Sequence, residues 1–170
     1  DAEKLSGKGD TSQKLTLMKT SADSLKKSAD ALNDSSLWEK KKIKKKDEKT
    51  GEEIEVEDYD WDKITKAVKS FVEDYNDVVK EAGESNTKDV LRNASWMTGM
   101  TDKNSNMLAK IGITIGKGNK LELDEDALKQ ADISSLKTVF TGYNSFVSKI
   151  SQKATGISNA ANRASATYTN

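Results

Sequence analysis

The sequence predicts a mainly α-helical protein: an elongated, coiled-coil-like antiparallel helix bundle with two small β-hairpins. Three stretches carry apolar residues at alternating spacings of three and four, the pattern of helices that pack side by side. Apolar residues make up 34% and charged residues 33% of the 170-residue chain, so its core is thin. The chain has no proline, which suits long uninterrupted helices. We expect one helical-bundle domain over residues 1–170, forming a piece of a longer protein.

Composition excludes several classes of function. The chain has neither cysteine nor histidine, which removes disulfides, thiolate or imidazole metal sites and histidine-based catalysis. Basic and acidic residues number 28 each, so no net charge attracts nucleic acid. No apolar run is long enough to cross a membrane. Carboxylate or Ser–Lys pairs could still catalyse a reaction, but solvated helix faces explain these residues more simply. We expect no enzyme, cofactor, metal site, small-molecule substrate, nucleic-acid partner or membrane insertion.

The first predicted helix runs from about Thr11 to Asn33. We expect Asp10 to be its N-cap, with Gln13 completing a capping box, and residues 1–10 to be loose. A narrow apolar stripe along this helix must meet another helix to leave water. The stripe consists of Leu15, Met18, Ala22, Leu25, Ala29 and Leu32.

A basic run followed by an acidic run, over residues 37–59, predicts a β-hairpin turning about Lys49–Thr50. Cross-strand pairs of opposite charge contribute roughly 0.2–1 kcal/mol each, so the two runs neutralise each other. The alternative, a nucleic-acid-binding patch, is the weaker interpretation. The expected partners are Lys42–Glu57, Lys44–Glu55, Lys46–Glu53, Ile43–Val56 and Lys45–Ile54. Because an isolated hairpin is marginal, its apolar residues should rest on the helices, together with Trp38 or Trp61.

The second predicted helix begins after Asp60, a good N-cap, and ends at Gly83 as its C′ residue. Its stripe consists of Ile64, Val68, Phe71, Tyr75, Val78 and Ala82. Asn86 is expected to cap a third helix that breaks near Thr98–Gly99. The helix then resumes through Leu108 to Lys110.

A second hairpin is predicted over residues 112–124, pairing Ile115 with Leu121 and Ile113 with Leu123. The glycines of 112–118 loosely resemble a phosphate-binding loop. The segment lacks the Ser or Thr after its lysine and leads into a strand, so we predict no nucleotide site there.

Three helices complete the chain. Asp124 opens a short helix, and another one holding Leu136 stops at Gly142. The last helix runs from about Tyr143, and we expect it to be antiparallel to the second helix. Its tail to Asn170 should fray unless the first helix holds it. The stripe of this last helix consists of Phe146, Ile150, Lys153, Ile157, Ala160 and Ala164.

Four short patterns follow one another between Phe71 and Phe140. They read Phe71-Val72-x-x-Tyr75-Asn76, Leu108-x-x-Ile111-Gly112-Ile113, Leu121-x-Leu123-Asp124 and Val139-Phe140, with Leu128 and Ala131 before the last. In this order and spacing they resemble the C-terminal half of the flagellar filament-capping family, also called flagellar hook-associated protein 2. The chain departs from that family at Asn119–Lys120, where a glycine is usual, and it has no large outer domains.

The resemblance implies a secreted, self-assembling structural protein of the bacterial flagellum that serves motility. Such proteins leave through the flagellar channel without a cleaved signal peptide, form a ring at the filament tip and help flagellin fold into place. The implied partners are further copies of the chain and flagellin-like or hook-junction subunits. Two other classes stay open: a bacterial surface adhesion module, which a large exposed aromatic patch would favour, and an intracellular, cytoplasmic helical scaffold or chaperone.

Overall fold

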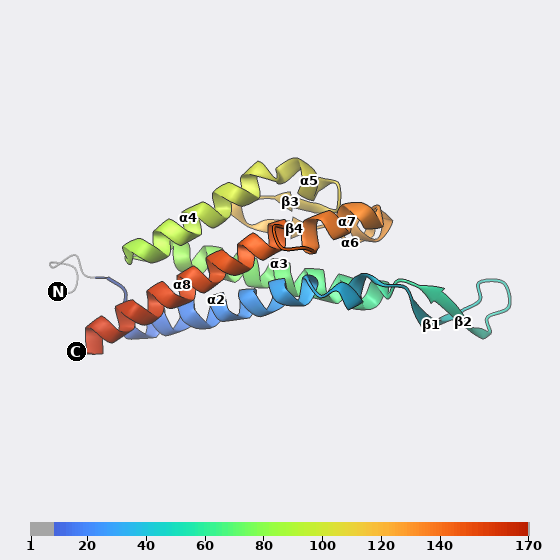
Figure 1. The fold of residues 1–170 in the computed structure, drawn as a ribbon, viewed down its shortest axis with the longest axis horizontal. Helices are drawn as coiled ribbons and strands as arrows, with labels where there is room; N and C mark the ends of the chain where they lie inside the picture. The colour runs from blue at the N-terminus through green and yellow to red at the C-terminus, as the bar shows by residue number, and fades with distance from the viewer. Residues whose placement is uncertain (1–8, 170) are drawn as a thin grey trace.

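The computed structural model describes residues 9–169, with side chains for residues 9–166. Four long helices form an elongated bundle, and a hairpin extends it at one end (Figure 1). The prediction of a mainly α-helical fold with two small hairpins is confirmed. The long helices are α2 (Ser12–Leu32), α3 (Trp61–Gly83), α4 (Lys88–Lys103) and α8 (Phe146–Thr169).

Neighbouring helices of the bundle run in opposite directions (Figure 1). Helix α2 packs against α3 and α8, and α4 packs against α3 and α8. Helix α8 therefore lies diagonally across from α3 and runs parallel to it, so the expectation of an antiparallel pair was wrong. The reason is that α4 is a full fourth helix of the bundle. In an up-down-up-down order the second and fourth helices share a direction.

The start of α2 differs from the prediction. Thr11 is the N-cap, and its hydroxyl accepts a hydrogen bond from the Lys14 N–H at 3.2 Å. Gln13 is exposed. Asp10 is buried and points instead to the turn between α3 and α4, so it is fixed rather than loose. Residues 1–8 and 170 lie outside the described part of the chain.

The α3–α4 turn is held by Asp10 from outside. The Asp10 carboxylate accepts hydrogen bonds from the Ser85 hydroxyl at 2.7 Å, the Thr87 hydroxyl at 2.7 Å and the Asn86 N–H at 2.9 Å. Thr87, not Asn86, is the N-cap residue of α4. Gly83 is the last residue of α3 rather than a left-handed C′ residue. The Asp10 side chain, which is distant in sequence, therefore accepts the hydrogen bonds of this turn that a local capping residue was expected to satisfy.

The first hairpin has the predicted register but not the predicted position. Strands β1 (Lys41–Lys46) and β2 (Glu53–Asp58) pair as expected at every position, including Lys44 with Glu55. The strands leave the end of the bundle and project beyond it (Figure 1). Ile54 is 39% exposed, so the expectation that the hairpin rests on the helices was wrong. Trp38, in the 3-10 helix η1 (Ser35–Trp38), is fully packed into the core.

Helix α4 continues through Thr98–Gly99 without the predicted break. A helical glycine costs about 1 kcal/mol relative to alanine. Met97 and Thr101, on either side of Gly99, are both buried and pack one face of α4 against the core. This packing offsets the cost of the helical glycine. The break comes instead at Asn104, between α4 and the short α5 (Ser105–Ala109).

The segment between α5 and α8 packs alongside α3 and against α8 (Figure 1). Strands β3 (Ile113–Ile115) and β4 (Leu121–Leu123) flank the 3-10 helix η2 (Lys117–Asn119) and pair in the predicted register. Helices α6 (Glu125–Gln130) and α7 (Ile133–Phe140) follow. Asp124 caps α6 as predicted by accepting from the Ala127 N–H at 3.1 Å.

Helix α8 begins at Phe146 rather than Tyr143, and the Ser145 hydroxyl accepts from the Ser148 N–H at 3.2 Å. Its buried face uses Ala154 in place of the predicted Lys153. A shift of one residue puts the small side chain inside and leaves the ammonium group at the surface, which avoids burying a charge.

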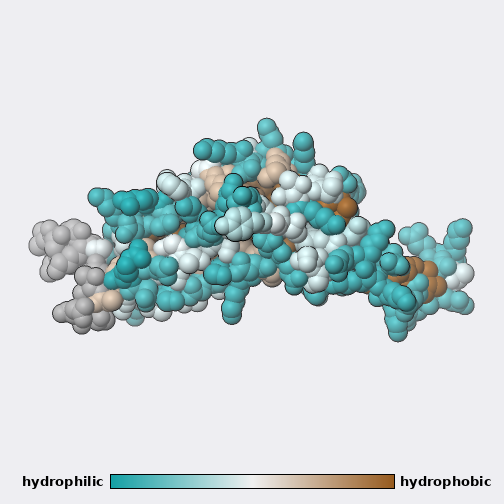
Figure 2. All heavy atoms as spheres, in the orientation of Figure 1, coloured by the Kyte–Doolittle hydropathy of each residue, from teal (hydrophilic) through white to brown (hydrophobic). Residues whose placement is uncertain are grey.

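Aromatic rings join the elements at the arm-bearing end of the core. The Trp38 ring stacks on Phe140 with centroids 5.5 Å apart, and its Nε1–H donates to the Leu32 carbonyl at 2.7 Å. Phe71 meets Phe140 and Phe146 edge to face at 6.4 and 6.3 Å. This cluster links α3, α7, α8 and the segment before β1. The surface seen in Figure 2 is mostly hydrophilic, with a few apolar patches.

Candidate interaction surfaces

The described residues contain no cluster of acidic side chains suited to a metal ion. Within residues 9–169, no helix is both long and apolar enough to cross a membrane.

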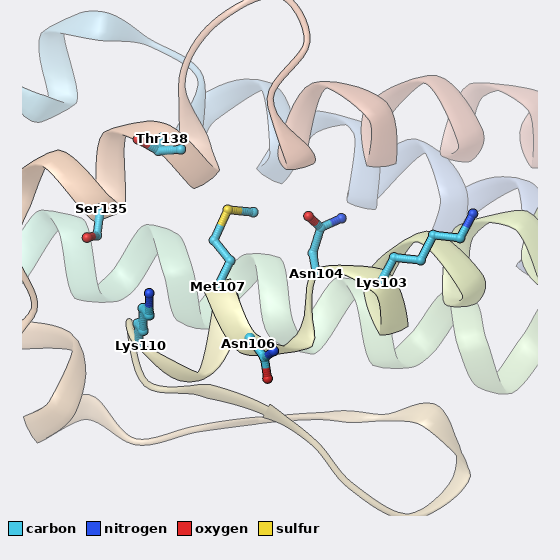
Figure 3. A pocket seen from close by; sticks show the side chains of 7 residues that line it. All are labelled: Lys103, Asn104, Asn106, Met107, Lys110, Ser135 and Thr138. Carbon is cyan, nitrogen blue, oxygen red and sulfur yellow. The ribbon is translucent and has the colours of Figure 1, made fainter.

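A shallow groove of 380 Å³ lies between the α4–α5 junction and α7 (Figure 3). Its lining offers amides, hydroxyls, ammonium groups and a thioether, but no carboxylate. Lys103 points away from the other side chains, so the polar groups do not converge on one position (Figure 3). The lining residues are Lys103, Asn104, Asn106, Met107, Lys110, Ser135 and Thr138. We assign no chemistry to this groove.

The first hairpin, residues 41–58, forms the most distinctive surface, and we call it the charged arm. Lys45 Nζ lies 2.7 Å from the Asp58 carboxylate, and Lys44 Nζ lies 3.9 Å from the Glu53 carboxylate. Glu53 is two residues away on β2 from Glu55, the register partner of Lys44. The hydrogen bond from Lys45 and another from the Tyr59 N–H hold the pKa of Asp58 below its usual value. These ion pairs are largely exposed, so each contributes little stability.

The two faces of the charged arm differ in chemistry. One face carries the lysines at 42, 44 and 46 beside the glutamates at 53, 55 and 57. The other face carries Ile43, Ile54 and Val56, none of them fully buried, together with the charged residues Lys41, Lys45 and Asp58. Figure 2 shows this apolar patch on the arm, surrounded by hydrophilic atoms. An apolar patch on a projecting element is typical of an interaction surface.

Aromatic side chains line the base of the charged arm. Tyr59 and Trp61 are half-buried and meet edge to face at 6.1 Å, and Lys40 Nζ lies 5.6 Å from the Tyr59 ring centre. Together with Ile43 they border an open hollow of 310 Å³. Lys44, Lys45, Asp60 and Asp62 also line this hollow, so it combines apolar and charged groups.

A polar ladder, which sequence reasoning missed, joins α2 to α8. The Ser151 hydroxyl donates to Asp30 at 2.7 Å, and Ser158 hydrogen-bonds Asp23, so the two rungs are seven residues apart on both helices. Burial raises the pKa of Asp23, but the bonds from Ser158 and Lys19 outweigh it and leave this pKa lowered. The signal was present in the sequence: Lys-x-Ser-Ala-Asp occurs twice, starting at residues 19 and 26.

Two aromatic side chains are exposed away from the arm. Trp96 on α4 is 63% exposed, and Lys153 Nζ sits 4.0 Å above its ring in a cation–π contact. Tyr143, in the α7–α8 turn, is 85% exposed. Sequence reasoning placed Lys153 on the buried stripe and gave Trp96 no role.

Four of the residues that carry the family resemblance, Asn76, Gly112, Leu121 and Asp124, make contacts that position the second hairpin. The Asn76 amide bridges the backbone of Leu121, donating to its carbonyl at 2.9 Å and accepting from its N–H at 2.7 Å. Gly112 has φ +91°, and a Cβ there would lie 2.7 Å from the Asp124 carbonyl oxygen. The Asp124 N–H in turn donates to the Gly112 carbonyl at 2.8 Å. The resemblance therefore falls on residues that hold the second hairpin against α3.

The protein was compared with family models, curated sequences and solved structures. None of these comparisons finds a significant match.

Proposed function

We propose that this chain is a structural subunit of a bacterial flagellar filament cap, secreted and self-assembling, that catalyses no reaction. The observation that carries the proposal is the junction of Asn76, Gly112, Leu121 and Asp124. The patterns that resemble the capping family are spread over the sequence, yet they contact one another and determine how the second hairpin sits. The order, spacing and mutual contacts of these patterns favour an architecture shared with the capping family over a chance similarity of sequence.

The shape of the bundle also supports a role in assembly. The start of α2 and the end of α8 lie at one end, and the charged arm projects from the other (Figure 1). Such a subunit can contact different neighbours at its two ends. The proposed partners are further copies of the chain and flagellin-like or hook-junction subunits. The proposed location is the filament tip outside the cell, reached through the flagellar channel.

Deleting the gene tests the proposal. We expect loss of motility, release of unassembled flagellin into the medium, and recovery of both by the full-length gene. In sedimentation, the protein as the cell produces it should form a defined ring-like assembly. Normal motility of the deletion strain, with a full-length protein that stays monomeric at high concentration, would overturn the proposal.

A surface adhesion module is the second candidate, and exposed Trp96 favours it. Exposed tryptophans can stack on sugar rings, and Trp96 is 63% exposed even with Lys153 above its ring. A glycan array separates the two functions. Binding that Trp96→Ala abolishes, in a strain whose motility does not need the gene, would favour adhesion.

A further inference from the structure

We propose that the charged arm pairs edge to edge with the arm of a second copy of this chain, β1 of one copy against β2 of the next. The inference rests on the self-assembly that the proposed function requires, and it names one contact through which subunits meet. It is carried by the backbone geometry and the charge distribution of the arm.

Both strands of the arm have an open edge, because in the described part of the chain they pair only with each other. The Asp47 N–H donates to the Glu52 carbonyl at 2.7 Å. This bond determines which residues of β1 and β2 direct their backbone N–H and C=O groups toward each other. Backbone groups of alternate residues then point outward from an antiparallel pair. The outward-pointing residues are Lys42, Lys44 and Lys46 on β1 and Glu53, Glu55 and Glu57 on β2.

The charges at these edges select one arrangement of two copies. When β1 meets β2 of the next copy, each lysine can lie beside a glutamate on the same face, and opposite charges stabilise such pairs. When β1 meets β1, or β2 meets β2, like charges face each other and oppose pairing. The arm therefore favours head-to-tail contacts, which build rings or filaments, over a two-fold symmetric strand pair.

The apolar face adds to the same contact. In a head-to-tail sheet, Ile43 of one copy lies near Ile54 and Val56 of its neighbour, so the patch seen in Figure 2 extends from copy to copy. Burial of this surface favours association. A single strand pair is nevertheless a small contact and is weak alone. It strengthens when other contacts hold the copies close together.

Cross-linking tests the direction of pairing, because the chain contains no cysteine of its own. Two variants of the whole chain are made, Lys44→Cys and Glu55→Cys, and each is oxidised mildly to form disulfides, alone and in an equimolar mixture. A disulfide needs Cα atoms within about 7 Å, which adjacent strands ~4.8 Å apart satisfy and second-neighbour strands do not. We expect the mixture to give several-fold more cross-linked dimer than either variant alone. The yield should fall in about 1 M salt, where the Debye length is about 3 Å.

Two results would overturn the inference. One is efficient cross-linking of Lys44→Cys with itself, which indicates a two-fold or unspecific contact. The other is a yield in the mixture no higher than that of Lys129→Cys, a control on the exposed surface of α6. A variant that exchanges the lysines at 42, 44 and 46 with the glutamates at 53, 55 and 57 keeps opposite charges across the arm. It should associate with itself as the natural chain does, and failure to do so also contradicts the inference.

The outcome is separable from that of the proposed function. If a full-length protein lacking residues 41–58 still forms the ring-like assembly and supports motility, the arm pairing is wrong and the cap proposal stands. If arms cross-link as expected but the gene is dispensable for motility, the pairing stands and the cap proposal fails.

Discussion

At the scale of single residues, Asp10 shows how one carboxylate replaces a local cap. It is 3% exposed, and three donors of the α3–α4 turn converge on it. Burial raises its pKa, but the hydrogen bonds from Thr87, Ser85 and Asn86 outweigh burial and leave the pKa below its usual value. The charged form is therefore the one that stabilises the fold.

We expect Asp10→Asn to lower the free energy of unfolding by about 1–3 kcal/mol at pH 7, because the amide cannot accept all three hydrogen bonds. The folded-state pKa is depressed, so the charge stabilises fully above the unfolded pKa, and its contribution is lost as pH falls through the folded pKa. The difference between variant and natural chain should thus be constant above about pH 5 and shrink below about pH 4. Urea denaturation across this range measures it.

Asp74 provides the matched control. Burial raises its pKa, and the charges of Asp77 and Glu73 raise it further against the hydrogen bond from Ser28. Its negative charge is unfavourable in the folded state, so Asp74→Asn should not destabilise the protein at pH 7. Equal destabilisation by both substitutions would show that charge at Asp10 has no special role.

The Asn76 amide is the second test at this scale. Asn76→Ala removes both bonds to the backbone of buried Leu121, so we expect a loss of about 1–3 kcal/mol and faster hydrogen exchange of the Leu121 amide. Asn33 makes the same double bridge to Gly142, at 3.2 and 2.9 Å, but at the surface. Water can replace that bridge, so Asn33→Ala should cost clearly less. A larger loss in Asn33→Ala would contradict this account.

At the scale of elements, the crossing of α4 and α8 depends on Gly156. A Cβ at this position would lie 2.4 Å from Asn93 Oδ1. The glycine lets the Asn93 side chain sit between the helices, where its amide donates to the Asp89 carbonyl at 2.8 Å. Glycine in mid-helix is unfavourable by itself, so the close contact and the backbone preference oppose each other.

The two effects can be separated. We expect Gly156→Ala to destabilise the natural chain, because Asn93 must turn away. In an Asn93→Ala background the same change should stabilise by up to about 1 kcal/mol, since only the gain in helix propensity remains. Thermal unfolding of the four proteins of this double-mutant cycle gives the coupling. Destabilisation of the same size in both backgrounds would locate the conflict elsewhere.

At the scale of the whole molecule, the bundle and the charged arm are energetically distinct. The core aromatics reach Trp38 but not the strands, whose residues are exposed or half-buried. Strand pairing starts at Lys41 with Asp58, so the arm leaves and rejoins the bundle at neighbouring points.

Replacing residues 41–58 with a short Gly-Ser linker should therefore change the stability of the bundle by less than about 0.5 kcal/mol, the range of ordinary surface substitutions. Urea denaturation followed by tryptophan fluorescence measures the change. A loss of several kcal/mol would show that the arm belongs to the cooperative unit.

Local patterns predicted the elements well because they are local. Charge alternation set the arm's register, and apolar spacing set the buried faces of α2 and α3. Some helix boundaries and one position of the α8 stripe were off by one to three residues. The larger failures concern distant contacts. Asp10 was assigned to the nearest helix because nothing in its neighbourhood reveals Ser85. The direction of α8 depended on recognising α4 as a full helix despite its glycine. The arm's position depended on where its strands leave the bundle, which strand patterns do not encode.

The polar ladder between α2 and α8 repeats every seven residues on both helices, so it could also form if α8 were displaced along α2 by seven residues. Moving α8 by one heptad, about 10.5 Å at 1.5 Å per residue, would place Ser158 beside Asp30 and Ser165 beside Asp23. Ile157 and Ala161 would then take the places of Ile150 and Ala154. The two hydrogen-bonded pairs therefore fix which faces of α2 and α8 meet. They can form at more than one position of α8 along α2, so they do not fix how far one helix is displaced along the other. The edge-to-face contacts of Phe71 with Phe140 and Phe146 occur only once among the described ring pairs, and they select one of these positions of α8.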